Sequence, residues 1–254
     1  MALFSGLDLG EVADFSALAT LDRQPLENPL PRNRFRYSLR WLETWDLGTE
    51  YPTICHEVAE RFESPQLAWT PLAPDFTGVG RGVLHILRSA KPKARLHPIA
   101  ISPGLEATKM DPAAGIDHHK VPKKDLVGVF RGLIQPHPGY GPLITFPDPK
   151  RMPSRTPAEK KYQHTITRFV RELQDFRVKI TKARNETYSA DASQHDDLVL
   201  AVMLAAWLGE NTGGGDVSGI GLPHAGAGSM LERAPSGTFA SDVPYHPDRR
   251  SDRD

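Results

Sequence analysis

The sequence is poor in cysteine and has no long apolar run, and each lack excludes a class of protein. Cys55 is the only cysteine, so no disulfide can form within the chain, which favours a reducing compartment. No window offers the ~18 uninterrupted apolar residues that a membrane-spanning helix needs. The N-terminus also lacks a basic segment before a hydrophobic run, the pattern of a secretory signal. The sequence therefore predicts a soluble, intracellular protein that does not enter a membrane.

The chain has no net charge, but its charges are unevenly distributed. Lys and Arg total 31, as do Asp and Glu. Between His118 and Glu186, however, there are fifteen Lys/Arg against six Asp/Glu. A neutral protein with one basic region can bind a polyanion through that region. The alternative is a solvated basic surface without a partner, and the charge count alone leaves both open.

A phosphate-binding loop of the Gly-x-x-x-x-Gly-Lys-[Ser/Thr] type is also missing. The nearest stretch, Gly78-Val-Gly-Arg-Gly82, has no lysine that could reach nucleotide phosphates. This absence excludes a P-loop ATPase motor within the chain.

The most informative stretch that is present is an acidic pair followed by an apolar run. Asp196 and Asp197 come directly before Leu198–Leu208, whose one polar side-chain group is the indole N–H of Trp207. The run is too short to span a bilayer and apolar on all sides, so we expect a helix buried in a core. One acid could cap this helix while the other is solvated. Alternatively, both acids bind a cation together with carboxylates from elsewhere, because two adjacent carboxylates otherwise repel each other.

Periodicity predicts an α/β domain with a mixed sheet flanked by helices. We expect strands at 2–9, 15–21, 35–45, 67–75, 95–102, 143–146 and 177–182. We expect helices near 52–62, 81–89, 122–133, 157–176 and 198–208, and a long loop at 103–119. The domain is expected to span residues 1–208. Residues 209–254, with nine Gly, four Pro and no apolar periodicity, are expected to form a disordered tail.

Two further aspartates follow predicted strands. Asp8 ends the first strand and Asp75 ends the fourth, and α/β sheets place their sites at the carboxyl ends of strands. Taken singly, Asp8 fits a strand-end turn and Asp75 fits an Asx-turn before Gly78. Together with the acidic pair they supply the oxygen ligands that Mg²⁺ or Mn²⁺ prefers. Two such ions ~3.5–4 Å apart can promote cleavage of a phosphodiester.

Four short motifs resemble the nuclease domain of the large terminase subunit of tailed bacteriophages. They are Gly6-Leu-Asp-Leu-Gly10, Asp75-Phe-Thr-Gly-Val-Gly80, Val121-Pro-Lys-Lys-Asp-Leu126 and His195-Asp-Asp-Leu-Val-Leu-Ala201, in the order that the family has. The resemblance implies a ribonuclease H-like fold and an endonuclease that cuts double-stranded DNA during genome packaging, with a divalent metal. It further implies that Asp8 and Asp75 are the first two metal ligands and catalytic residues. The third is Asp196 or Asp197, both of which are expected at the site.

The same resemblance suggests what the site binds and where the protein works. Lys123, Lys124, Arg184 and His195 are candidate DNA-binding residues, although a plain surface role fits each of them as well. The family's large subunits carry a packaging ATPase, which is missing here, so we expect the ATPase as a separate domain or subunit. The portal and the small terminase are further expected partners, and the expected location is the host cytoplasm.

Three other functions share part of this pattern. The first is another ribonuclease H-like phosphodiesterase, such as a Holliday-junction resolvase or a transposase, which would differ in the shape of its DNA substrate. The second is an actin-like kinase or ATPase, since Gly6–Gly10 resembles a first phosphate loop, although such proteins need a longer, duplicated chain. The third is a non-catalytic DNA-binding or motor-docking module whose acids hold a structural ion.

Overall fold

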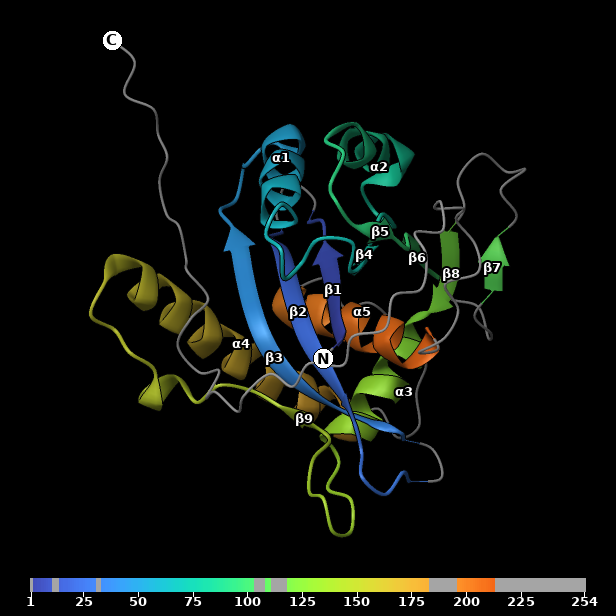
Figure 1. The fold of residues 1–254 in the computed structure, drawn as a ribbon, viewed down its shortest axis with the longest axis vertical. Coiled ribbons are helices and arrows are strands. Elements are labelled where there is room, and N and C mark those ends of the chain that lie inside the picture. The colour runs from blue at the N-terminus through green and yellow to red at the C-terminus, as the bar shows by residue number, and fades with distance from the viewer. Residues whose placement is uncertain are drawn as a thin grey trace, which may run out of the picture.

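The computed structural model describes residues 2–10, 14–30, 33–102, 108–110, 118–182 and 196–212. Its strands are β1 (Ala2–Asp8), β2 (Ser16–Pro25), β3 (Phe35–Trp45), β4 (Pro71–Pro74), β5 (Arg95–Leu96), β6 (Ile99–Ser102), β7 (Thr108–Met110), β8 (His118–Pro122) and β9 (Ile144–Thr145). Its helices are α1 (Tyr51–Arg61), α2 (Gly80–Ser89), α3 (Lys123–Ile134), the short 3-10 helix η2 (Pro149–Arg151), α4 (Pro157–Lys182) and α5 (Asp197–Asn211). Figure 1 shows their arrangement.

The main sheet has six strands in the order β5-β4-β1-β2-β3-β9. Strand β2 is antiparallel to both β1 and β3, whereas β4 and β5 continue the sheet beyond β1 in the parallel direction. This order, an antiparallel meander extended by parallel strands next to the first one, is the ribonuclease H-like arrangement that was predicted. The predicted mixed sheet is confirmed.

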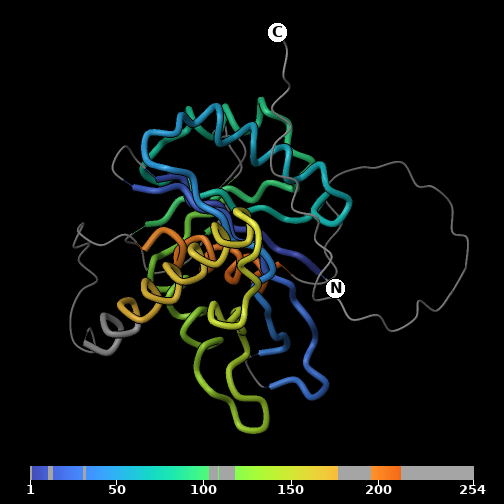
Figure 2. The backbone as a smooth tube through the Cα atoms, turned by 90° about the vertical axis from the view of Figure 1, so that its left-hand side faces the viewer, coloured from blue at the N-terminus to red at the C-terminus, as the bar shows by residue number. Residues whose placement is uncertain are grey.

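Helices cover both faces of this sheet, and each face has its own hydrophobic cluster. Helices α1 and α2 pack on one face, where Leu7, Leu18 and Leu72 are buried. Helices α3, α4 and α5 pack on the other face, around Phe4 and Ala19. Figure 2 shows α1 and α2 on one side of the strands and α4 and α5 on the other. Because alternate residues of a strand point to opposite faces, Asp8 lies on the same face as Phe4 and Gly6, the face that α5 covers.

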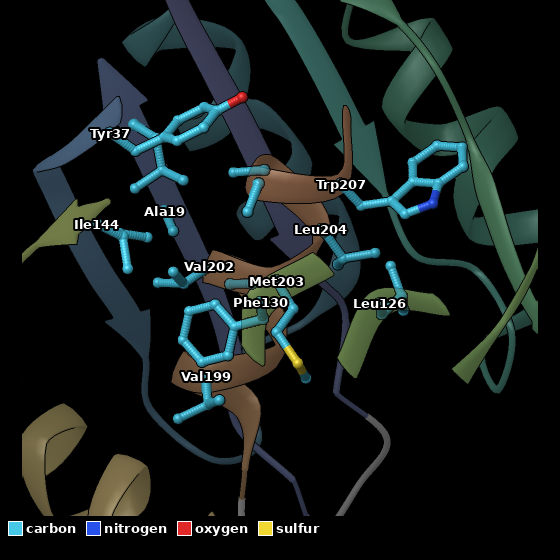
Figure 3. Close-up of a cluster of buried hydrophobic side chains, with 14 of the residues drawn as sticks. Ala19, Tyr37, Leu126, Phe130, Ile144, Val199, Val202, Met203, Leu204 and Trp207 are labelled. Carbon is cyan, nitrogen blue, oxygen red and sulfur yellow. The ribbon is translucent and has the colours of Figure 1, made fainter. Parts of the chain in front are cut away.

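Helix α5 is buried along nearly its whole length, as its apolar sequence predicted. Its side chains meet α3 on one side and the sheet on the other, and Figure 3 shows Val202, Met203 and Trp207 among them. The helix comes very close to β1 at Gly6. A Cβ atom on Gly6 would lie 2.2 Å from the backbone oxygen of Ala201 and 2.6 Å from the backbone nitrogen of Ala205. Gly6 is therefore needed for α5 to reach its place across the strand.

The region after β4 differs from the prediction. The expected strand 95–102 is divided between two sheets, with β5 at the edge of the main sheet and β6 in a second sheet of order β6-β8-β7. The break falls at Pro98, which has no N–H for a sheet but whose oxygen accepts a hydrogen bond from His119 N–H. The expected loop 103–119 contains β7 and the start of β8, so the prediction of a continuous loop was wrong there. The alternation of apolar and polar residues that identifies a strand is weak in His118–Pro122, because the first three of its five residues are two histidines and a lysine.

The chain also departs from the prediction around α5. The predicted strand 177–182 was wrong, since α4 continues without a break to Lys182. No Gly or Pro follows Pro157 within this helix to stop it. Helix α5 is longer than predicted, because its C-terminal end lies at Asn211 and not at 208. Arg23 of β2 donates to the carbonyl oxygen of Gly209 in this added turn. The remainder of the predicted tail, 213–254, lies outside the described residues.

None of the helices in the described ranges is both long and apolar enough to cross a bilayer.

Candidate functional site

Asp8 and Asp75 lie side by side at the carboxyl edge of the main sheet. Asp8 is the last residue of β1, and Asp75 directly follows β4, which runs parallel to β1. The backbone N–H of Asp75 donates to the carbonyl oxygen of Leu7 over 2.8 Å, which fixes the two chain segments next to each other. Both aspartates are 7% exposed. The parallel pairing therefore brings together two acids that are 67 positions apart in the chain.

Thr77 holds the Asp75 carboxylate in place. The Asp75 Oδ1 atom accepts hydrogen bonds from the Thr77 N–H, at 2.8 Å, and from the Thr77 hydroxyl. The same hydroxyl oxygen accepts from the Ile101 N–H of β6 at 2.7 Å. Asp75 also forms an isolated bridge with Ile99. The turn after β4 is thus tied to the second sheet, and the orientation of Asp75 depends on both sheets.

Asp196 and Asp197 stand at the N-terminus of α5 in different surroundings. Asp196 is at the N-cap position, is partly exposed and lies 4.0 Å from the Lys123 Nζ atom. Asp197, in the first turn, is 6% exposed. Its Oδ2 atom accepts from the Phe15 N–H and from the Arg168 Nη2 group, each at 3.3 Å. The structure thus distinguishes a buried acid from a peripheral one, which the sequence did not.

The side chain of Asp196 makes no capping hydrogen bond, so the simple capping interpretation of that aspartate is wrong. The first turn of α5 receives its acceptor from another helix instead. Glu172 of α4 accepts the Leu198 N–H through its Oε2 atom at 3.1 Å. An acceptor that comes from α4 leaves the carboxylate of Asp196 available for another role.

The pKa of Asp8 is influenced by burial and by the charges of the other three aspartates. Burial raises the pKa of Asp8 well above its ordinary value, and the charges of Asp75, Asp197, Asp196 and Asp14 raise it further, in that order. Burial also raises the pKa of Asp75, although the hydrogen bonds from Thr77 and the charge of Lys123 act in the opposite direction. Acids from β1, the turn after β4 and the start of α5 therefore share one electrostatic environment.

This environment predicts an unusual dependence of stability on pH. A carboxyl group whose pKa is raised by folding holds a proton in the native state that the unfolded chain has already released. The free energy of unfolding should then fall as pH rises from the unfolded pKa, near 4, towards the higher folded value. In EDTA we expect a higher melting temperature at pH 5.5 than at pH 7.5, measured by circular dichroism. The difference should shrink in Asp8→Asn. A melting temperature that increases with pH over this range would contradict the electrostatic account.

The donor set fits a hard divalent cation, because it consists of carboxylate oxygens in a buried, strongly negative position. Within the described ranges, no three His, Cys, Asp or Glu side chains are close enough together to hold one metal ion as they stand. Several of these carboxylates have partners of their own: Thr77 for Asp75, Lys123 for Asp196 and Arg168 for Asp197. Mutual repulsion favours such pairing when no cation lies between the acids.

The candidate DNA-binding residues fall into two groups. Lys123 and Lys124 open α3, where Lys123 is close to Asp196 and lowers the pKa of Asp75, so it lies at the acidic site. Lys124 is exposed. Arg184 and His195 lie outside the described residues.

Sequence reasoning missed Glu172 and the function of Arg168. Arg168 is one of the fifteen basic residues counted between His118 and Glu186, and neither it nor Glu172 was singled out. Their spacing of four on a helix is a recognisable signal for an ion pair, and Arg168 Nε lies 2.8 Å from Glu172 Oε1. Burial raises the pKa of Glu172 to about 7, against the opposing charge of Arg168.

Comparison with known proteins gives matches only at the level of structure. No known family model and no curated protein sequence matches the chain. Two solved structures of the human cytomegalovirus terminase nuclease domain, one soaked with Mn and the other soaked with Mn and bound to an inhibitor, are similar to it. They share 16% and 14% identity, each with a TM-score of 0.46, and the matches cover 82% and 83% of both chains. The large terminase nuclease from the thermophilic phage G20c shares 17% identity, with a TM-score of 0.42 over 80% of both chains. Similarity this low assigns no residue roles to the present chain.

Proposed function

We propose that the chain is a metal-dependent endonuclease that cuts double-stranded DNA, the nuclease module of a terminase-type genome-packaging enzyme. The observation that carries this proposal is the convergence of Asp8, Asp75, Asp196 and Asp197 from three separate elements. Electrostatic repulsion among buried acids is costly, and it is common at sites that bind cations or perform catalysis. Three of the four motifs that resemble the terminase nuclease domain contain these same aspartates, and this agreement supports the terminase assignment.

The aspartates would hold Mg²⁺ or Mn²⁺, two ions in all, with Asp8, Asp75 and Asp197 in buried positions and Asp196 at the periphery. When bound, the ions would supply charge stabilisation to the attacking and leaving oxygens of a phosphodiester. The protein's own residues would prepare the site. Thr77 fixes the direction of Asp75, and the burial of Asp8 and Asp197 strengthens every electrostatic interaction there.

Lys123 is suited to hold the DNA backbone. It starts α3, it is partly exposed, and its Nζ atom lies beside the acidic site. A lysine in this position can attract a phosphate towards carboxylates that would otherwise repel it. Lys124, Arg184 and His195 are further candidates for contacts with the DNA backbone, which position DNA without selecting a sequence. A packaging ATPase, the portal and the small terminase are the partners that the proposal implies.

Incubation with supercoiled plasmid in Mn²⁺, in Mg²⁺ and in EDTA tests the proposal. We expect nicked and linear products with at least one of the metals and none in EDTA. Stable DNA binding without cutting under every metal condition would favour the docking-module alternative. A parallel reaction with a four-way junction separates the resolvase alternative, because a resolvase should cut the junction far faster than a linear duplex.

A further inference from the structure

Arg168 connects three parts of the chain at the acidic site. It lies in the middle of α4, with 24% of its side chain exposed. Its Nη2 group is 3.3 Å from Asp197 Oδ2, and its Nε group is 2.8 Å from Glu172 Oε1. The guanidinium also stacks over the ring of Phe15, with Cζ 4.0 Å from the ring centre. One side chain thus contacts the residue before β2, a second position on α4 and the first turn of α5.

The three residues that Arg168 contacts, Glu172, Asp197 and Phe15, are also bonded to one another or to the first turn of α5. Glu172 accepts the Leu198 N–H through the oxygen that Nε does not use. The Asp197 oxygen that faces Arg168 also accepts the Phe15 N–H. The carboxylates of Glu172 and Asp197 are therefore each held by the Arg168 guanidinium and by a backbone N–H. None of these three side chains is more than 24% exposed. The 2.8 Å bond from Arg168 to Glu172 has the length of a charge-assisted hydrogen bond, which is stronger than a neutral one, whereas the contact with Asp197 is longer, at 3.3 Å.

We propose that Arg168 is a positioning residue that orients Asp197 for cation binding. By holding Oδ2 from one side, together with Phe15, it fixes the rotation of the carboxylate. Its charge also offsets part of the repulsion between Asp197 and Asp8, whose pKa the Asp197 charge raises. This inference rests on the proposed function, because the oriented carboxylate is one of the proposed metal ligands.

The geometry requires arginine in particular. A guanidinium presents donors in a fixed plane, so Nε and Nη2 can serve Glu172 and Asp197 together while the flat face stacks on Phe15. A lysine ammonium retains the charge but lacks this planar pair of donors. Arg168→Lys therefore separates the contribution of charge from that of geometry.

The test compares Mn²⁺ binding, by isothermal titration calorimetry, to the parent chain, Arg168→Lys, Arg168→Gln and Glu172→Gln. Replacing residues that hold metal ligands in place commonly lowers metal affinity 10–100-fold. We expect roughly a tenfold loss or more for both Arg168 variants, and a smaller loss for Glu172→Gln, which keeps an acceptor for Leu198. Arg171→Gln is the matched control: it removes the same charge from an exposed position of the same helix and should bind Mn²⁺ like the parent.

The outcomes distinguish this inference from the proposed function. If the parent chain does not bind Mn²⁺, the proposed function fails. If the parent binds and Arg168→Lys or Arg168→Gln binds equally well, or more tightly because arginine competes with the ion, the positioning role is wrong. Melting temperatures in EDTA identify the folded variants. Should neither Arg168 variant fold, Glu172→Gln decides, since a parent-like affinity in that isosteric variant overturns the inference.

Discussion

Asp8→Asn and Asp75→Asn should each abolish Mn²⁺-dependent cutting of plasmid while leaving a folded protein. Asparagine keeps the shape and one acceptor oxygen but removes the charge that would hold the cation. Loss of one electrostatic stabiliser in an active site typically lowers the rate roughly 100–1,000-fold, and we expect at least this effect. The double variant should be no worse than either single one, because residues that act as a unit are not additive.

Stability should change in the opposite direction from activity. In EDTA at pH 7.5 the melting temperature of Asp8→Asn should rise, because the substitution removes a buried charge that Asp75, Asp197 and Asp196 repel. Asp175→Asn, an exposed position on α4, serves as the control and should alter neither quantity. Parent-like cutting by both Asp8→Asn and Asp75→Asn would exclude the two-metal nuclease.

At the acidic pair, the two members should differ. The charge of Asp197 raises the pKa of Asp8 more than the charge of Asp196 does, and Asp197 is the more buried of the two. We therefore expect Asp197→Asn to remove cutting and Asp196→Asn to weaken the apparent affinity for Mn²⁺. Cutting rates measured over a range of Mn²⁺ concentrations distinguish a lower maximum rate from weaker binding. The reverse assignment would mean that the peripheral acid is the principal ligand.

Gly6→Ala should cause a large loss of stability. The new Cβ would meet backbone atoms of Ala201 and Ala205 at 2.2 and 2.6 Å, and backbone cannot rotate away as a side chain can. Helix α5 or strand β1 must then move. Overpacking typically costs about 1–3 kcal/mol and occasionally more, and we expect a clash with backbone to fall at the upper end of this range. Urea denaturation at pH 7.5 measures the change in the free energy of unfolding.

Gly128→Ala is the matched control for this substitution. Gly128 lies within α3, and a Cβ there would meet nothing within 4 Å. Alanine has the better helix propensity, so this variant should gain about 0.5–1 kcal/mol. A Gly6→Ala protein within about 0.5 kcal/mol of the parent would show that α5 can shift freely over β1, contrary to the packing described here.

The positions of most elements could be predicted because they depend on local patterns. Alternation in Phe35–Trp45 marked β3, and helical spacing marked α1 and α2 within a residue or two. The apolar run after Asp197 predicted a buried helix because such a surface cannot face water. Asp8 and Asp75 were identifiable as candidates because strand ends are readable from the sequence and parallel strands share their carboxyl edge.

Errors arose where the short local pattern did not decide the conformation. His118–Pro122 becomes a strand because β6 and β7 lie on either side of it, and neither neighbour is evident from its own polar composition. Residues 177–182 continue α4 although their short alternation suggested a strand. In His118–Pro122 the local preference is weak and tertiary contacts override it. In 177–182, by contrast, no Gly or Pro ends the helix that begins at Pro157.

By itself, the sequence predicted an α/β domain, a buried helix after Asp197 and four candidate metal ligands, because periodicity and strand ends are local properties. Only the tertiary structure decided how those ligands differ. It buries Asp197 and leaves Asp196 partly exposed. It also makes Glu172 the acceptor for the Leu198 N–H in the first turn of α5, and it brings Arg168 to Asp197, 29 positions away in the chain. These contacts join α4, α5 and the segment before β2, whose approach depends on the packing of the whole face. Burial and charge at the site follow from that packing, so no window of sequence contains them.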